Sequence, residues 1–349
     1  MILTDSMIEA ALNFRDAEPW EELTDSDIFA VQLANGQKAY CAIMGNAGQH
    51  FSLGIYVGEK GFTTYLSNLS MPDDQLSIMQ RVVQFDCINC DFMQANEIDP
   101  TVKKIIRSYA TMHDRKIPRK HGWIDFTRFS PYKAQWCITR QEDARIAEEC
   151  LKAATFFAEY FHCKSYEEVG LDSWGRYPSI QGGKSIPLLL PQGNNTYKLG
   201  TTKTPGAIIE PPASPSFNND ILAHRIMSLP KTQDLECRLL HAPSGVMVDG
   251  EEVPVLAGSI LLVDKNTGML LMPFTTTDYP SHTTELLTKF ANHLADYQLN
   301  PSQIDVCDEN TYQLLQSFCE KCAIKLNFTE HPVHLNEVCS YFLAQMMGL

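Results

Sequence analysis

The apolar positions in the last third of the chain switch between a strand period and a helix period in a regular order. A short helix at 220–228 leads into three strand-like runs, and the polar residues 265–268 between the second and third suit a hairpin turn. Helices and strands then alternate. The predicted strands are 235–241, 259–264, 269–275, 303–308 and 323–328, and the predicted helices are 220–228, 281–297, 311–322 and 334–346. The hairpins make the first three strands neighbours, and the crossovers should place the fourth and fifth strands parallel beside the first.

The N-terminal part has a different pattern, in which short strands in quick succession precede helices. The first two strand-like runs are joined by Asn35-Gly36, a dipeptide that favours a tight hairpin. Apolar residues spaced three and four apart then mark helix faces. The predicted strands are 28–33, 38–44 and 53–57, and the predicted helices are 100–112 and 142–161. This order predicts an antiparallel meander within a mixed domain.

Composition changes between residues 176 and 220, which hold seven of the nineteen prolines and five glycines. Proline can neither donate to a sheet ladder nor continue a helix, so this stretch is interpreted as a linker or a surface excursion. We therefore predict an α+β protein in three parts. Residues 1–170 form an N-terminal mixed α+β domain, residues 171–220 form the Pro/Gly-rich linker or surface excursion, and residues 221–349 form a domain with a mixed sheet and flanking helices.

Charge and cysteine usage restrict the class of partner. The net charge is −14, and residues 231–349 alone carry six basic and fifteen acidic side chains. Such a chain repels a phosphate backbone, so we expect a protein partner rather than nucleic acid. No apolar run reaches the length of a membrane span, and the N-terminus lacks the features of a secretory signal. Eleven cysteines in a chain of this size then indicate reduced thiols in the cytoplasm.

Two stretches resemble known families. Residues 262–270, the long helix after them and residues 301–308 together resemble the core of transposase and integrase domains in the ribonuclease H-like superfamily. Residues 20–23 and 40–58 resemble the N-terminal part of uncharacterised two-domain bacterial proteins of unknown function. The first resemblance implies a ribonuclease H-like sheet in the C-terminal half, and the second carries no known activity.

The ribonuclease H-like resemblance also implies where a metal-dependent site would lie. Enzymes of that class hold two divalent metals with carboxylates from the first strand, the end of the fourth strand and a late helix. The residues at those positions are Glu236, Asp308 and Glu337. Asp308 fits the pattern and is the residue expected to bind metal if any does. Glu337 lies on the far side of its helix from the apolar stripe. Glu236 is followed by Cys237 and Arg238, whereas active members have an aspartate-led first strand.

The leading hypothesis is therefore a non-enzymatic binding or scaffold protein with a degenerate ribonuclease H-like domain and no cofactor. The alternative is a phosphodiesterase or nuclease that depends on Mg²⁺ or Mn²⁺.

A third hypothesis rests on residues 103–136, a locally basic and aromatic segment in an acidic chain. Basic side chains beside aromatic rings can bind an anion or single-stranded nucleic acid by pairing and stacking. A solvated loop beside a strand whose aromatic residues are core is the competing interpretation. The candidate contact residues are Arg115, Lys116, Arg119, Lys120 and Trp123.

Two Cys-x-x-Cys pairs and one glycine-bearing loop complete the candidates. The pairs Cys87/Cys90 and Cys319/Cys322 could together supply four thiolates to zinc. The second pair continues the apolar face of its helix and is interpreted as core, whereas the sequence leaves metal binding by Cys87 and Cys90 open. Residues 44–50 contain Gly45 and Gly48 but lack the Lys-Ser/Thr of a phosphate-binding loop, so they are interpreted as a turn between strands.

Overall fold

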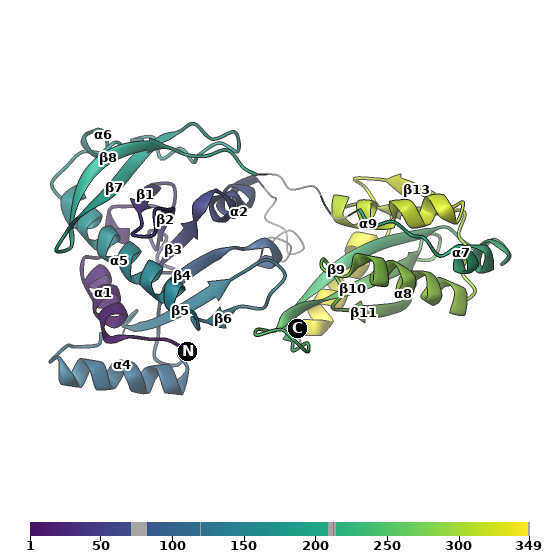
Figure 1. Cartoon of the computed structure of the whole chain (residues 1–349), viewed down its shortest axis with the longest axis horizontal. Helices are drawn as coiled ribbons and strands as arrows, with labels where there is room; N and C mark the ends of the chain where they lie inside the picture. Colours follow the sequence, from purple (N-terminus) through teal and green to yellow (C-terminus); the bar gives the residue numbers. More distant parts are fainter. Residues whose placement is uncertain (71–81, 119, 209–211, 213, 348–349) are drawn as a thin grey trace. The chain divides into compact units, whose positions relative to one another are not determined.

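The computed structural model describes residues 1–70, 82–118, 120–208, 212 and 214–347. The chain forms two compact units, and the α+β class predicted from the sequence is confirmed. The first unit comprises Met1–Met71, Gln84–Pro131 and Gln135–Ile209. The second is formed chiefly by Glu210–Leu349, joined by Tyr132–Ala134. Figure 1 shows the elements of both.

The first unit is built on an eight-stranded sheet with the order β6-β5-β4-β3-β2-β1-β7-β8. All neighbouring strands are antiparallel except β1 and β7, so the predicted meander is present as β1–β3 and extends through β6. The strands are β1 (Phe29–Gln32), β2 (Lys38–Met44), β3 (Ser52–Val57), β4 (Cys87–Met93), β5 (Trp123–Phe129), β6 (Trp136–Cys137), β7 (Ser185–Gly193) and β8 (Thr196–Lys203).

Successive strand residues point to opposite sides, so apolar side chains lie on both faces of this sheet. Helices cover both faces. On one face α1 and α5 pack over a core that includes Phe29 and Ile43. On the other face α2 covers β2 and β3, where Tyr40 and Phe62 are in contact. Asp99 caps α4, which begins at Pro100. The helices are α1 (Asp5–Asp16), a 3-10 turn (Pro19–Glu21), α2 (Gly58–Ser70), α4 (Pro100–Met112), α5 (Gln141–Phe161) and α6 (Tyr166–Val169).

The prediction of a linker or surface excursion at 171–220 is wrong for the hairpin β7–β8, which belongs to the first sheet. β7 pairs in parallel with β1 only at Leu188 and Leu189, while its other edge pairs with β8. Pro187 and Pro191 flank this short contact with β1, where a missing backbone N–H costs little. The proline content that suggested a linker is thus compatible with a strand that pairs briefly on one side.

The second unit contains a five-stranded sheet with the order β11-β10-β9-β12-β13. β9, β10 and β11 are antiparallel, and β12 and β13 follow in parallel beside β9, so the predicted strand order is confirmed. The strands are β9 (Leu235–Val246), β10 (Val255–Asp264), β11 (Leu270–Thr276), β12 (Gln303–Val306) and β13 (Lys325–Phe328), and the helices are α7 (Asp220–Met227), α8 (Thr283–Asp296), α9 (Glu309–Lys321) and α10 (Leu335–Met347).

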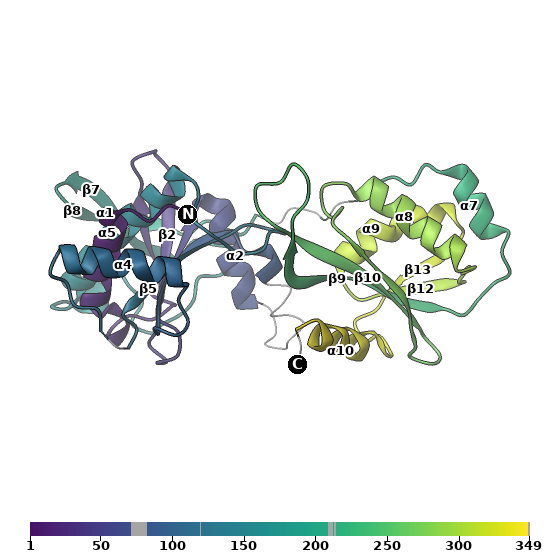
Figure 2. The same ribbon diagram turned by 90° about the horizontal axis from the view of Figure 1, so that it is seen from below.

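The helices of this unit lie on both faces of its sheet. Figure 2 shows α8 and α9 on one face and α10 on the other. All ten residues of β10 are buried, as expected for a central strand covered on both sides. Along β9, Cys237 and Leu239 join the core under α8 and α9, whereas Leu240 joins the core under α10. Glu236 and Arg238 therefore project toward α10.

Tyr132–Ala134 adds to the second unit beyond the predicted start at residue 221. The Tyr132 carbonyl accepts a hydrogen bond from the Leu256 N–H at 2.9 Å, and Lys133 forms a bridge with Val255 at the start of β10. The Tyr132 ring lies 5.3 Å from the His241 ring and 5.4 Å from the Tyr279 ring, centroid to centroid. Among the helices in the described parts of both units, none is long and apolar enough to span a bilayer.

Candidate functional site

The Glu236 side chain on β9 binds the backbone at the start of α10. Its side chain is completely buried, and its carboxylate accepts the backbone N–H groups of Val333, His334 and Leu335. The last two bonds go to Oε2 at 2.9 and 2.8 Å. The first turn of a helix has unpaired N–H groups and a partial positive charge, so a buried anion there caps the helix. Glu236 thus supplies the cap from another element.

Asp308 holds the start of α9 in a similar way. As the N-cap residue, it accepts the Thr311 N–H at 2.9 Å and the Thr311 hydroxyl at 2.8 Å. Burial raises the pKa of Asp308, although the bonds from Thr311 and the charge of Arg238 oppose that effect. Asp308 lies just past the end of β12, as the sequence predicts, but both carboxylate oxygens already have partners.

Glu337, the third predicted carboxylate, is exposed on α10. The apolar stripe of this helix, which includes Leu335, Cys339 and Leu343, packs against β9 and β10. The position agrees with the expectation that Glu337 faces solvent. The three carboxylates therefore have three separate environments.

Arg238 places a fixed positive charge among these elements. Its side chain is only 8% exposed, its Nε lies 3.7 Å from Asp308 Oδ2, and one terminal nitrogen lies 3.4 Å from Asn336 Oδ1. Across both units, the described residues include no group of three His, Cys, Asp or Glu side chains arranged to hold a metal ion. A guanidinium thus accompanies Asp308 where the resemblance places divalent cations. The signal in the sequence was the Glu236-Cys-Arg238 spacing, which puts both charges on one strand face.

In the basic and aromatic segment 103–136, the candidate contact residue Trp123 does not present its ring to solvent. Trp123 is 6% exposed, and Lys103 Nζ and Arg107 Cζ lie over its ring at 5.6 and 5.2 Å from the centroid. Arg115 donates to Asn13 at 3.0 Å and to Asp16 at 3.1 Å. A base could stack on Trp123 only after both cations moved. Lys116 and Lys120 are exposed, and Arg119 lies outside the described residues.

The two cysteine pairs do not form one metal site. Cys87 and Cys90 belong to the cores on opposite faces of the first sheet, so their thiols point apart. Burial raises the pKa of Cys87 to about 12 and that of Cys90 well above its ordinary value, which disfavours the thiolate that zinc requires. Cys319 and Cys322 are buried at the C-terminal end of α9, as the core interpretation expects. All eleven cysteines are free.

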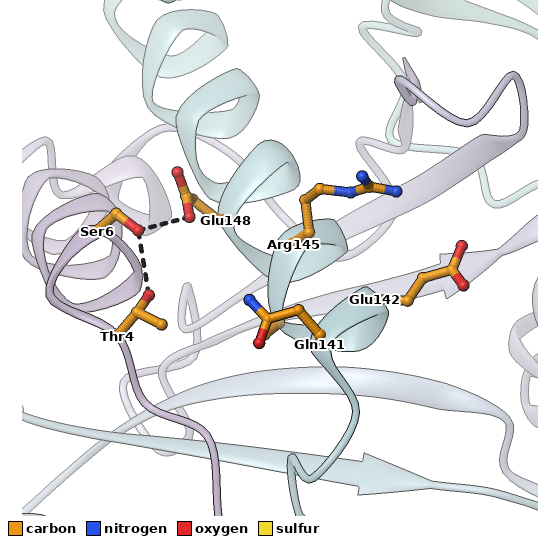
Figure 3. Close-up of a pocket in the computed structure, with 7 residues that line it drawn as sticks. Thr4, Ser6, Gln141, Glu142, Arg145 and Glu148 are labelled. Carbon is orange, nitrogen blue, oxygen red and sulfur yellow. Dashed lines mark hydrogen bonds between the residues drawn. The ribbon is translucent and has the colours of Figure 1, made fainter.

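A surface pocket of about 510 Å³ lies between the first turns of α1 and α5 (Figure 3). Ser6 donates to Glu148 at 2.7 Å, and Thr4 lies 3.1 Å from Ser6 through their hydroxyl oxygens. Burial would raise the pKa of Glu148, but hydrogen bonds from Lys152 and Ser6 outweigh it and lower that pKa. A carboxylate stabilised in this way is a weak base, so the Ser6–Glu148 pair serves the α1–α5 contact rather than nucleophilic catalysis.

Two family models match the chain, one within the first unit's main span and one within the second's. Residues 5–170 match the model of a domain of unknown function (DUF7309), and residues 222–343 match that of a second domain of unknown function (DUF6930). No curated protein matches the chain. Both models describe domains of unknown function, so the comparisons name no activity for the chain. The comparisons do not confirm the ribonuclease H-like resemblance, for which the strand order of the second sheet is the structural counterpart.

Proposed function

We propose that this chain is a non-enzymatic binding or scaffold protein whose second domain keeps a ribonuclease H-like strand order and uses its acidic residues for structure. The observation that carries the proposal is the Glu236 carboxylate, whose two oxygens accept three backbone N–H groups of the α10 turn. A metal ligand at this position would have to leave the helix uncapped. Mg²⁺ also demands near-octahedral oxygen geometry, which a single remaining aspartate does not supply.

The charge of the second domain supports a protein partner over nucleic acid. Residues 231–349 contain only six Lys and Arg side chains, against fifteen Asp and Glu. Four of the six are already paired with carboxylates, and these are Arg238, Lys265, Lys289 and Lys321. Phosphate contacts provide most of the affinity in non-specific nucleic-acid binding, so this surface offers little for such a ligand.

The thiols support a cytoplasmic location. Eleven free cysteines, several of them buried together in the two domains, suit a reducing compartment. Burial raises the pKa of Cys237, Cys319 and Cys339 above the usual value, which slows their oxidation.

The test is a cleavage assay with the full chain. Single-stranded, duplex and hybrid oligonucleotides are incubated in millimolar Mg²⁺ or Mn²⁺, beside the Asp308→Asn variant and the matched control Glu337→Gln. We expect no metal-dependent cleavage by any of the three proteins. Cleavage by the parent chain and by Glu337→Gln that is lost in Asp308→Asn would establish the phosphodiesterase alternative instead.

A further inference from the structure

A row of polar residues crosses three neighbouring strands of the first sheet. Ser52 on β3 pairs with Asp91 on β4, and Asp91 pairs with Asp125 on β5. Directly paired residues in antiparallel strands project from the same face, so the three side chains lie side by side. They are separated by the strand spacing of about 4.8 Å.

Part of the same sheet face is apolar, which sets this row apart. Over β1 and β2 it carries Ala30, Tyr40 and Ala42, which pack with Phe62 of α2. Over β3–β5 the next row on this face, Gly54, Asn89 and Thr127, is also polar or small. Two adjacent polar rows on central strands are not what packing under a helix requires.

Ser52 has a buried hydroxyl without a partner. The residue is 0% exposed, and no hydrogen-bond partner of its Oγ is found in the part of the chain that the structure describes. Buried polar groups in native proteins are nearly always paired, so an unpaired one calls for a specific explanation. A hydroxyl held beside Asp91, in one row with Asp125, is explained if it completes a binding site.

Asp91 and Asp125 give this row an excess of negative charge. Both are half-buried, and burial together with the neighbouring Asp91 charge raises the pKa of Asp125. His50 lies close to Asp91: its Nε2 is 3.1 Å from Asp91 Oδ1, and its side chain is 62% exposed. His50 comes from the glycine-bearing turn between β2 and β3, so it reaches the row from solvent and can be displaced without disturbing the core.

We propose that Ser52, Asp91 and Asp125 form a binding site for an organic cation that carries N–H donors, namely an ammonium or guanidinium group. The carboxylates supply the charge, the Ser52 hydroxyl accepts a further N–H, and the incoming cation displaces His50 from Asp91. A planar guanidinium presents several donors that suit paired carboxylates. A metal ion fits less well, because its ligands must converge within about 2.0–2.6 Å and the described side chains include no such group of three.

The test is isothermal titration calorimetry of the full chain with agmatine, which carries one guanidinium and one ammonium group. We expect one binding event per chain at low salt. Asp91→Asn and Asp125→Asn should each weaken it at least tenfold, and Ser52→Ala should weaken it about fivefold. His50→Ala should strengthen binding severalfold because it removes the competing imidazole.

Two controls distinguish binding at this site from general attraction to an acidic protein and from misfolding of the variants. Glu9→Gln removes one exposed negative charge from the same domain and should leave the affinity unchanged. Ser52→Ala removes a hydroxyl that has no hydrogen-bond partner among the described residues, so the melting temperature of this variant should not fall. Absence of agmatine binding, or equal weakening by Glu9→Gln and Asp125→Asn, would overturn the proposal. Binding of Mn²⁺ that is lost in Asp91→Asn, with no response to agmatine, would assign the row to a metal instead.

Discussion

Replacing Glu236 by glutamine tests whether this carboxylate is a helix cap or a metal ligand. The change keeps the size of the side chain but removes the charge and one acceptor oxygen. An amide nitrogen would then face the donor N–H groups at the start of α10. Because the side chain is completely buried, water cannot replace the lost bonds.

The size of the effect follows from the bonds that change. Oε1 accepts from Val333, and Oε2 accepts from His334 and Leu335, so the amide nitrogen displaces at least one of three bonds to an anion. A hydrogen bond to a charged group contributes about 1.5–3 kcal/mol. Loss of the charge at the helix N-terminus adds about 0.3–2 kcal/mol. We therefore expect Glu236→Gln to lower the free energy of unfolding of the second domain by about 2–4 kcal/mol.

The measurement is urea denaturation followed by circular dichroism, with Glu337→Gln as the control. Glu337 lies on the same helix and is exposed, so its loss should change stability by less than about 0.5 kcal/mol. Each variant is measured with and without millimolar Mn²⁺. The parent chain should show no stabilisation by the metal.

Equal stability of the two variants would refute the role of Glu236 as a helix cap. If Glu236 were a metal ligand, its neutralisation would leave the metal-free protein as stable or more stable and would abolish a stabilisation by Mn²⁺ that the parent chain shows. In the absence of metal, the cap role thus predicts that Glu236→Gln lowers the free energy of unfolding. The ligand role predicts that the change leaves this free energy the same or raises it.

Three further predictions concern the second domain and the thiols. Burial lowers the pKa of His241 to about 4, below its ordinary value of 6.5, so the unfolded chain binds a proton between these values and the folded chain does not. The contribution of His241 to stability should therefore be constant above pH 6.5 and fall by about 1.4 kcal/mol per pH unit as the pH drops toward 4. In urea denaturation, His241→Phe should lack this slope. An unchanged slope would refute the role of His241. Tyr132→Ala should destabilise the second domain by about 2 kcal/mol because the ring packs on His241 and Tyr279. Tyr132→Phe keeps the ring and loses only the hydroxyl that hydrogen-bonds to Tyr279, so it should destabilise the domain less in the same assay. Titration with a thiol reagent should show fast reaction of exposed Cys137 and Cys163 in the native protein and eleven thiols after denaturation without reductant; two or more missing thiols would contradict the reduced state.

The sheet of the second domain could be predicted because local rules determine it. Apolar periodicity located the strands, the hairpin at 265–268 fixed two neighbours, and the right-handed crossover rule placed β12 and β13. The helix predicted at 100–112 agrees with α4 because its apolar residues recur at helical spacing, and the structure adds Asp99 as its N-cap. Local chemistry was sufficient in both cases.

The roles of the site residues could not be predicted in the same way. Glu236 caps a helix that begins nearly one hundred positions later, and no local pattern reports that contact. The polar row of Ser52, Asp91 and Asp125 becomes visible only once the register of three strands is known. The hairpin β7–β8 was missed because its prolines weigh against a strand unless the extent of pairing on each edge is known.

The parallel pairing of β7 with β1 has a consequence for how the chain is made. β1 is synthesised early, but the strand that covers its outer edge follows about 160 residues later, after α5 and α6. Until then the growing chain carries a sheet with one open edge beside apolar side chains, a form prone to pairing with other chains. The match to the first family ends at residue 170, before β7 begins. A recombinant fragment cut at that point would keep the unfinished sheet of the nascent chain, so the first domain should be produced with its boundary beyond Lys203.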